Sequence, residues 1–160
     1  PAATGTATVC SAITLPASGT LDVTTGITSP DVPRTVTITG NQAGITGNVI
    51  IYGTDAAGKS LQATIIASGT TTVESAVAFK TVTKITVPQR NAAGDTISVG
   101  TGKKLGLPHK VYNAACLLVK LFNGSADSGT LTVSPTLGAN LYNLNGTPDG
   151  TKVVDLYYIV

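Results

Sequence analysis

The stretch "NVIIYGTDAAGKSLQATII", from Asn48 to Ile66, predicts two antiparallel strands joined by a tight turn. In its second half, Leu61, Ala63 and Ile65 alternate with polar residues, which is the period-2 pattern of a strand with one buried face. Between the two apolar runs, residues 55–59 match a type I turn followed by a glycine bulge. The stretch therefore predicts a β-hairpin.

The same stretch contains "GTDAAGKS", Gly53 to Ser60, which fits the phosphate-binding pattern G-x-x-x-x-G-K-[ST]. A phosphate-binding loop must lead into a helix whose first backbone amides and dipole hold the phosphates. The residues after Ser60 have strand spacing and reach Gly69 within nine residues, so they do not favour a helix. We predict a hairpin turn here, with no nucleotide and no other cofactor.

Similar short strand patterns recur along the chain. In "RTVTITG", Arg34 to Gly40, Val36 and Ile38 alternate with threonines. Turn clusters rich in Gly, Asn and Asp separate the strands, and alternating helices are absent. Nine or so short strands therefore predict an all-β, single-domain β-sandwich of the jelly-roll or immunoglobulin-like kind. The other candidate strands are "SAVAF", "TKITVP", "DTISVG", "CLLVKLF", "GTLTVS" and "VVDLYYIV".

Two departures from regular strand patterning are visible. Residues 1–33 contain three prolines and many Ser, Thr and Gly residues, which predicts an extended N-terminal arm or an edge strand, with the β-sandwich domain at 34–160. Phe79 and Ile85 have odd residue numbers while Val82 has an even one, so the three cannot all face the same side of a regular strand. This slip of phase predicts a bulge or a short bend at 80–84.

Composition excludes two classes of partner. Charged residues are 11% of the 160 residues and the formal net charge is +2, so the chain lacks the basic field that nucleic-acid binding requires. The longest apolar run, Cys116 to Phe122, is broken by Lys120 and is far shorter than the roughly 20 residues of a membrane helix. We expect a soluble or assembled protein made in the cytoplasm.

No pattern of catalytic or metal-binding residues is present. The single histidine, His109, lies beside Pro108 in a predicted loop, and no G-x-S-x-G motif occurs. Cys10 and Cys116 lie far apart and form no C-x-x-C pair, which favours buried free thiols, with a disulfide as the alternative. We predict no catalytic residues and no metal site.

A long block of the sequence resembles small structural proteins of tailed bacteriophages, particularly head decoration or cement proteins. The resemblance covers residues 34–108 and is carried by "RTVTITG", "GNVIIYGTDAAGKSLQATI", "GTTTVESAVAFKTVTKITVP" and "GDTISVGTGKKLGLP" in that order. It implies a virion protein on the capsid exterior that binds the major capsid protein, with no catalytic residues. By analogy with proteins at three-fold shell positions, it also implies a homotrimer.

The end of the chain is a candidate interface. Tyr157, Tyr158, Ile159 and Val160 form an apolar, β-prone segment, which is an aggregation hazard when it is left as an open edge. Pairing with another subunit removes that hazard. The alternative is that this segment is the last strand of the domain's own sheet.

Two other function classes remain open. A phage tail, neck or baseplate module for attachment or glycan binding requires an exposed aromatic or polar pocket. Tyr52, Tyr112 and Tyr142 are the internal tyrosines able to form one. A cellular adhesin or surface-layer repeat is disfavoured because the sequence shows no internal repetition.

Overall fold

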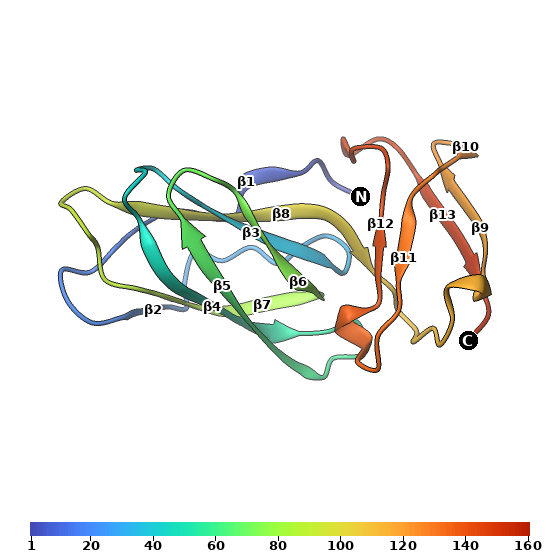
Figure 1. The fold of residues 1–160 in the computed structure, drawn as a ribbon, viewed down its shortest axis with the longest axis horizontal. Coiled ribbons are helices and arrows are strands. Elements are labelled where there is room, and N and C mark those ends of the chain that lie inside the picture. The colour runs from blue at the N-terminus through green and yellow to red at the C-terminus, as the bar shows by residue number, and fades with distance from the viewer.

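The computed structural model describes all 160 residues and confirms the predicted all-β class. It contains thirteen strands and two short 3-10 turns, arranged as three sheets (Figure 1). No helix has the length and hydropathy that a membrane-spanning helix requires.

The largest sheet, sheet A, has β8 at its centre. The order runs β6-β3-β8, and the far side of β8 pairs first with β1 and then, near its end, with β12. β12 pairs in turn with β11. All of these pairings are antiparallel. The strands are β1 (Gly5–Thr14), β3 (Arg34–Gly40), β6 (Val73–Phe79), β8 (Thr96–Gly106), β11 (Thr130–Thr132) and β12 (Leu141–Asn143).

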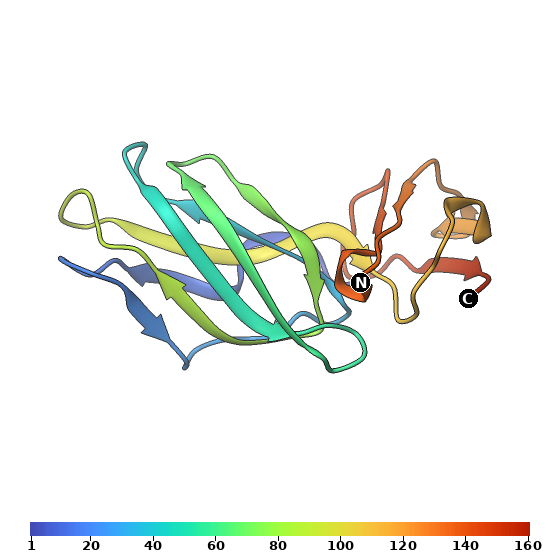
Figure 2. The same ribbon diagram turned by 60° about the horizontal axis from the view of Figure 1, so that its bottom comes forward.

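Sheet B has the order β2-β7-β4-β5, again with every pair antiparallel. Its inward side chains and those of sheet A form one cluster of 17 buried residues, so the two sheets enclose a common core. We call residues 1–106 the two-sheet body (Figure 2). The strands of sheet B are β2 (Leu21–Val23), β4 (Thr46–Thr54), β5 (Ser60–Ser68) and β7 (Thr81–Val87).

Residues 107–160, here called the C-terminal unit, lie at one end of the body (Figures 1 and 2). Most of the unit packs on a second, smaller cluster whose buried members are Leu105, Leu107, Val111, Tyr142 and Leu144. Sheet C in this unit has the order β10-β9-β13. Its elements are β9 (Leu117–Phe122), β10 (Ser125–Ala126) and β13 (Val154–Tyr158), and the 3-10 turns are η1 (Ala114–Cys116) and η2 (Leu137–Ala139).

The predicted hairpin at 48–66 is confirmed. β4 and β5 pair in register, and Gly58 has a φ of 80°. The Asp55 carboxylate accepts hydrogen bonds from the backbone amides of Ala57 and Lys59, at 2.9 and 3.0 Å. The segment that matches the phosphate-binding pattern is thus a turn between strands, and two of its amides already have an acceptor.

The predicted irregularity at 80–84 is also confirmed, and its cause is a change of sheet. β6 ends at Phe79 in sheet A, and β7 begins at Thr81 in sheet B after a bend at Lys80. The β4–β7 register then shifts, because Tyr52 pairs with Lys84 and Gly53 with Val82. Thr83 is therefore an extra residue in the strand, and it allows Val82 and Ile85 to face the core although one has an even number and the other an odd number.

Residues 1–33 contribute two edge strands to the body. β1 lies beside β8 and places Val9, Ile13 and Leu15 near it in the main core, while β2 lies beside β7. Adjacent Val9 and Cys10 are both buried, because the pairing of β1 with β8 shifts register twice. These bulges remove the simple alternation that identifies a strand from sequence.

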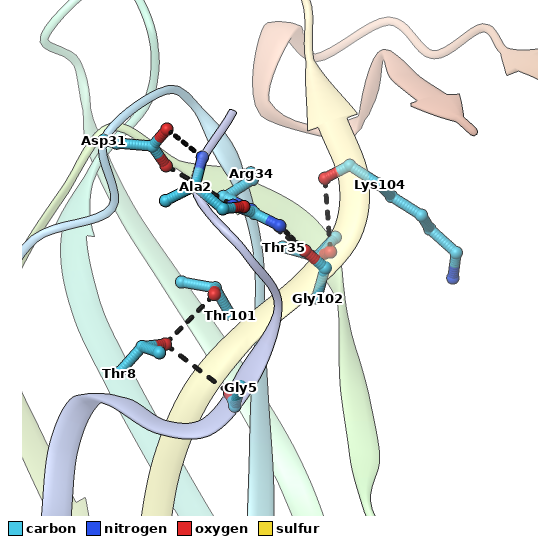
Figure 3. A network of polar contacts seen from close by, with 9 residues as sticks. All are labelled: Ala2, Gly5, Thr8, Asp31, Arg34, Thr35, Thr101, Gly102 and Lys104. Atoms are coloured by element: carbon cyan, nitrogen blue, oxygen red, sulfur yellow. Dashed lines mark hydrogen bonds and ion pairs between the residues drawn. The ribbon is translucent and has the colours of Figure 1, made fainter. Parts of the chain in front are cut away.

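A buried arginine ties the start of the chain to the body (Figure 3). The Nε and Nη2 atoms of Arg34 donate to the Gly102 carbonyl at 2.9 and 2.6 Å, and Nη1 donates to the Ala2 carbonyl at 2.8 Å. The Ala2 amide donates to Asp31, which also forms an ion pair with Arg34 at 3.4 Å. The Pro1 carbonyl accepts from the Gly150 amide, so this segment bridges the body and the C-terminal unit.

Candidate interaction surface

Strand β13 presents different chemistry on its two faces. Val154, Leu156 and Tyr158 pack against the second cluster, while Tyr157 lies on the opposite face and is 62% exposed. Ile159 follows with the same parity as Tyr157 and is 58% exposed. The alternation of the strand therefore directs one row of apolar side chains into the unit and leaves the other row in solvent.

Neighbouring residues extend the exposed row. Tyr157 pairs with Val119 on β9, and the register shift beside this pair places Leu118 in a bulge. Both β9 residues are exposed, as is Val153, the residue before β13. We define the sheet C surface as the five exposed side chains of Leu118, Val119, Val153, Tyr157 and Ile159.

The edge of sheet C beside this surface is open. β13 is the last strand in the order β10-β9-β13, so one row of its backbone amides and carbonyls lacks a strand partner. Its only charged residue is Asp155, and it contains no proline. Natural edge strands are commonly protected by charges, proline or bulges, and β13 has little of this protection.

The structure separates the four predicted interface residues. Tyr157, Ile159 and Val160 are exposed, whereas Tyr158 packs against the second cluster, and burial raises the pKa of its phenol. The segment is the last strand of its own sheet, at the edge rather than between neighbours, and Tyr157 on its outer face is exposed. Sequence reasoning missed Leu118, Val119 and Val153, because strand pairing between distant segments brings β9 beside β13.

The three internal tyrosines have different environments. Tyr142 is fully buried and its hydroxyl donates to Asp127 at 2.6 Å, so it supports the second cluster. Tyr52 is half-buried beneath the Lys84 ammonium, 4.2 Å from the ring centroid. Tyr112 is 74% exposed and carries the Lys110 ammonium 4.5 Å from its ring centroid. Two of the three tyrosines thus remain accessible to a ligand.

The cysteines are free thiols, as favoured from the sequence. Cys10 is buried in the main core, and that burial raises the pKa of its thiol. Cys116 is half-buried beside the second cluster. Each therefore contributes apolar packing to a different cluster.

The sheet C surface thus contains five of the nine exposed large hydrophobic residues, and it lies next to an unpaired strand edge. Such a combination is suited to protein association rather than to acid–base or metal chemistry. In comparisons with known proteins, no family model, curated protein or solved structure matched the chain.

Proposed function

We propose that this chain is a non-enzymatic virion protein that decorates a tailed-phage capsid and stabilises it by binding the major capsid protein. The observation that carries the proposal is the sheet C surface beside the open edge of β13. Burial of exposed apolar area contributes about 25 cal/mol per Å², and a partner strand on β13 would add main-chain hydrogen bonds. The resemblance of residues 34–108 to decoration proteins supports the same role.

We also propose that the two-sheet body is a jelly roll rather than an immunoglobulin-like sandwich. Its strands pair as though a long antiparallel ribbon had been rolled up, with β1 on β8, β2 on β7, β3 on β6 and β4 on β5. The pairings β3–β8 and β4–β7 complete the two sheets. Jelly rolls occur in viral capsid and lectin domains, which is compatible with a virion role.

The mechanism of stabilisation is mass action. A protein that binds the expanded shell, and not its dissociated subunits, stabilises the shell by RT ln(1 + [L]/Kd) at each site. At a free concentration 100 times Kd this is about 2.7 kcal/mol per site. Because many copies bind one shell, a modest stabilisation at each site adds up to a large resistance of the shell to rupture.

We propose a homotrimer as the assembled form, with copies placed around three-fold positions of the shell exterior. Covering apolar side chains between subunits is the usual basis of such assemblies. Light scattering of the purified chain measures the mass directly. A strictly monomeric protein at all concentrations would remove the trimer from the proposal and leave only the capsid contact.

The first test is the copy number of the chain in purified virions, measured by quantitative mass spectrometry against the major capsid protein. We expect a ratio near one, or a simple fraction repeated over the whole shell. A ratio of a few per cent would place the chain in the tail, neck or baseplate. Absence from virions would refute the proposal.

A binding experiment locates the contact. Capsids stripped of this chain are incubated with the wild type, with Tyr157→Asp or with Ile66→Asp, and bound protein is measured after sedimentation. Ile66 is a matched control because it is 67% exposed on β5 of the body, away from sheet C. We expect Tyr157→Asp to weaken binding at least tenfold and Ile66→Asp to leave it unchanged. Equal effects of the two changes would contradict a sheet C contact.

A further inference from the structure

Three hollows that share lining residues lie where the β4–β5 turn meets the C-terminal unit. The central hollow, of about 380 Å³, lies between this turn and the segment that contains η2. It shares Lys110 and Pro135 with a second hollow lined by Tyr112, and shares Ser60 and Leu61 with a third lined by Tyr52. We call this feature the tyrosine groove, because a tyrosine stands at each end.

Two lysines in the lining of the groove form no ion pair with a carboxylate: Lys59 and Lys110, which both line the central hollow. The one acidic residue in the lining, Asp55, is buried and accepts hydrogen bonds from the turn amides. Two lysines therefore contribute to the lining of one hollow, with the Lys110 ammonium above the Tyr112 ring, and their positive charge favours a ligand with negative charge.

The remaining lining is suited to a hydroxylated ligand. Ser60 and Thr136 offer hydroxyl groups in the central hollow. At the two ends, Tyr112 and Tyr52 offer aromatic rings, each held against a lysine. A sugar ring has an apolar face that packs on an aromatic ring and a rim of hydroxyls that hydrogen-bond with polar side chains.

We propose that the tyrosine groove binds an acidic polysaccharide, in which sugars bearing carboxylates occur along an extended chain. A carboxylate of the polymer lies between Lys59 and Lys110, and sugars on either side of it pack against Tyr112 and Tyr52. This assigns a role to Lys59 and Ser60 of the segment that matches the phosphate-binding pattern. The inference goes beyond the capsid role and does not rest on it, since the groove and the sheet C surface are different features.

The test uses hexagalacturonate as the acidic probe, maltohexaose as the neutral sugar and inorganic polyphosphate as the anion without sugar. Binding to the whole chain is followed by calorimetry and by NMR shifts of backbone amides. We expect hexagalacturonate to bind and to shift amides around the groove, with affinity falling as salt is raised. We expect maltohexaose and polyphosphate to bind at least tenfold more weakly.

Variants connect the binding to the groove. Lys59→Ala combined with Lys110→Ala should weaken the binding of hexagalacturonate roughly tenfold, because the variant removes both lysines from the lining of the central hollow. Tyr112→Ala removes a largely exposed ring and should weaken it several-fold without affecting folding. Lys103→Ala is the matched control, because Lys103 is an unpaired lysine outside the groove that lines another hollow with Thr37 and Thr101.

Three results would overturn the inference: no binding of hexagalacturonate at millimolar concentration, polyphosphate binding as tightly as the sugar, or equal weakening by Lys103→Ala. Capsid binding by the same variants is measured in parallel. A chain that fails to bind capsids but retains hexagalacturonate binding would refute the proposed capsid role and leave the groove assignment intact.

Discussion

The two-sheet body and the C-terminal unit are built from the same kind of short strands, yet they cover their apolar residues to very different degrees. The body encloses 17 buried residues in one cluster and leaves only Leu21 and Ile66 exposed among its large hydrophobic residues. The second cluster has five buried members, one of which, Leu105, belongs to the body, and the unit exposes seven large hydrophobic residues. A sheet of three strands has too little area to enclose a core, so the unit depends on its attachment to β8 and leaves one face exposed.

The largest expected effect comes from emptying the core of the body. Phe79 is fully buried between sheets A and B, and Phe79→Ala should lower the free energy of unfolding by about 3–5 kcal/mol. Urea unfolding followed by circular dichroism measures the change. If the C-terminal unit requires the folded body for its own stability, the body and the unit should unfold in a single transition in this variant. A loss below about 1 kcal/mol would show that the core tolerates the cavity.

The matching change in the C-terminal unit should act locally. Leu144 is fully buried in the second cluster, and Leu144→Ala should cost about 2–4 kcal/mol, mainly within that unit. Hydrogen exchange should show loss of protection in β9 and β13, while β4 and β8 remain protected. Uniform loss across both regions would mean that the two clusters form a single cooperative unit.

Acid should loosen the unit through Asp127. Burial raises the pKa of this carboxyl, but hydrogen bonds from Tyr142 and from the Asn145 and Gly129 amides outweigh it and hold the pKa below its usual value. The stabilisation is therefore complete above the unfolded pKa of about 3.9 and is lost as pH falls through the lower folded value.

Asp127→Asn provides the comparison for this pH effect. At pH 7 it should cost about 1–2 kcal/mol, because a charge-assisted hydrogen bond from Tyr142 is lost. At pH 2, below the unfolded pKa, the difference in stability between the two proteins should be smaller, because part of the stabilisation by the wild-type carboxylate has been lost. Denaturant titrations at both pH values measure the difference in the free energy of unfolding between wild type and variant. The same difference at both pH values would exclude titration of Asp127 as its cause.

The smallest effect on stability should come from the surface. Tyr157→Ser and Ile66→Ser both replace exposed side chains, so each should change the free energy of unfolding by less than about 0.5 kcal/mol. Their effects on association should differ, because only Tyr157 belongs to the sheet C surface. Sedimentation at rising concentration measures association. Equal association of the Tyr157→Ser and Ile66→Ser variants would contradict a specific role of the sheet C surface in association.

Local patterns predicted local structure well. The alternation and turn chemistry of 48–66 predicted the hairpin, and the change of parity at 80–84 predicted the bend where the chain leaves sheet A. Turn clusters rich in Gly, Asn and Asp were predicted between strands, and one such pair, Asn123 and Gly124, has positive φ between β9 and β10. Each of these features depends on a few neighbouring residues, and these are within reach of sequence reasoning.

Features that depend on distant pairing were not predictable. The bulges of β1 conceal its alternation, so residues 1–33 resembled an arm as much as a strand. The alternation of Tyr157 and Tyr158 is visible in the sequence, but which of them faces the core depends on how β13 packs against Leu105 and Tyr142. The tyrosine groove likewise joins the β4–β5 turn to residues 134–138, which no local pattern connects.

The pairing of the first strand with the eighth also determines how this chain reaches its native state. The hydroxyls of Thr8 and Thr101 meet at 3.0 Å across a separation of 93 residues. Because such long loops must be closed before their contacts contribute, we expect folding on the millisecond-to-second scale, as in other all-β proteins. During synthesis on the ribosome, β1 has no partner until β8 has emerged, so the nascent chain carries Val9 and Ile13 uncovered for most of its translation.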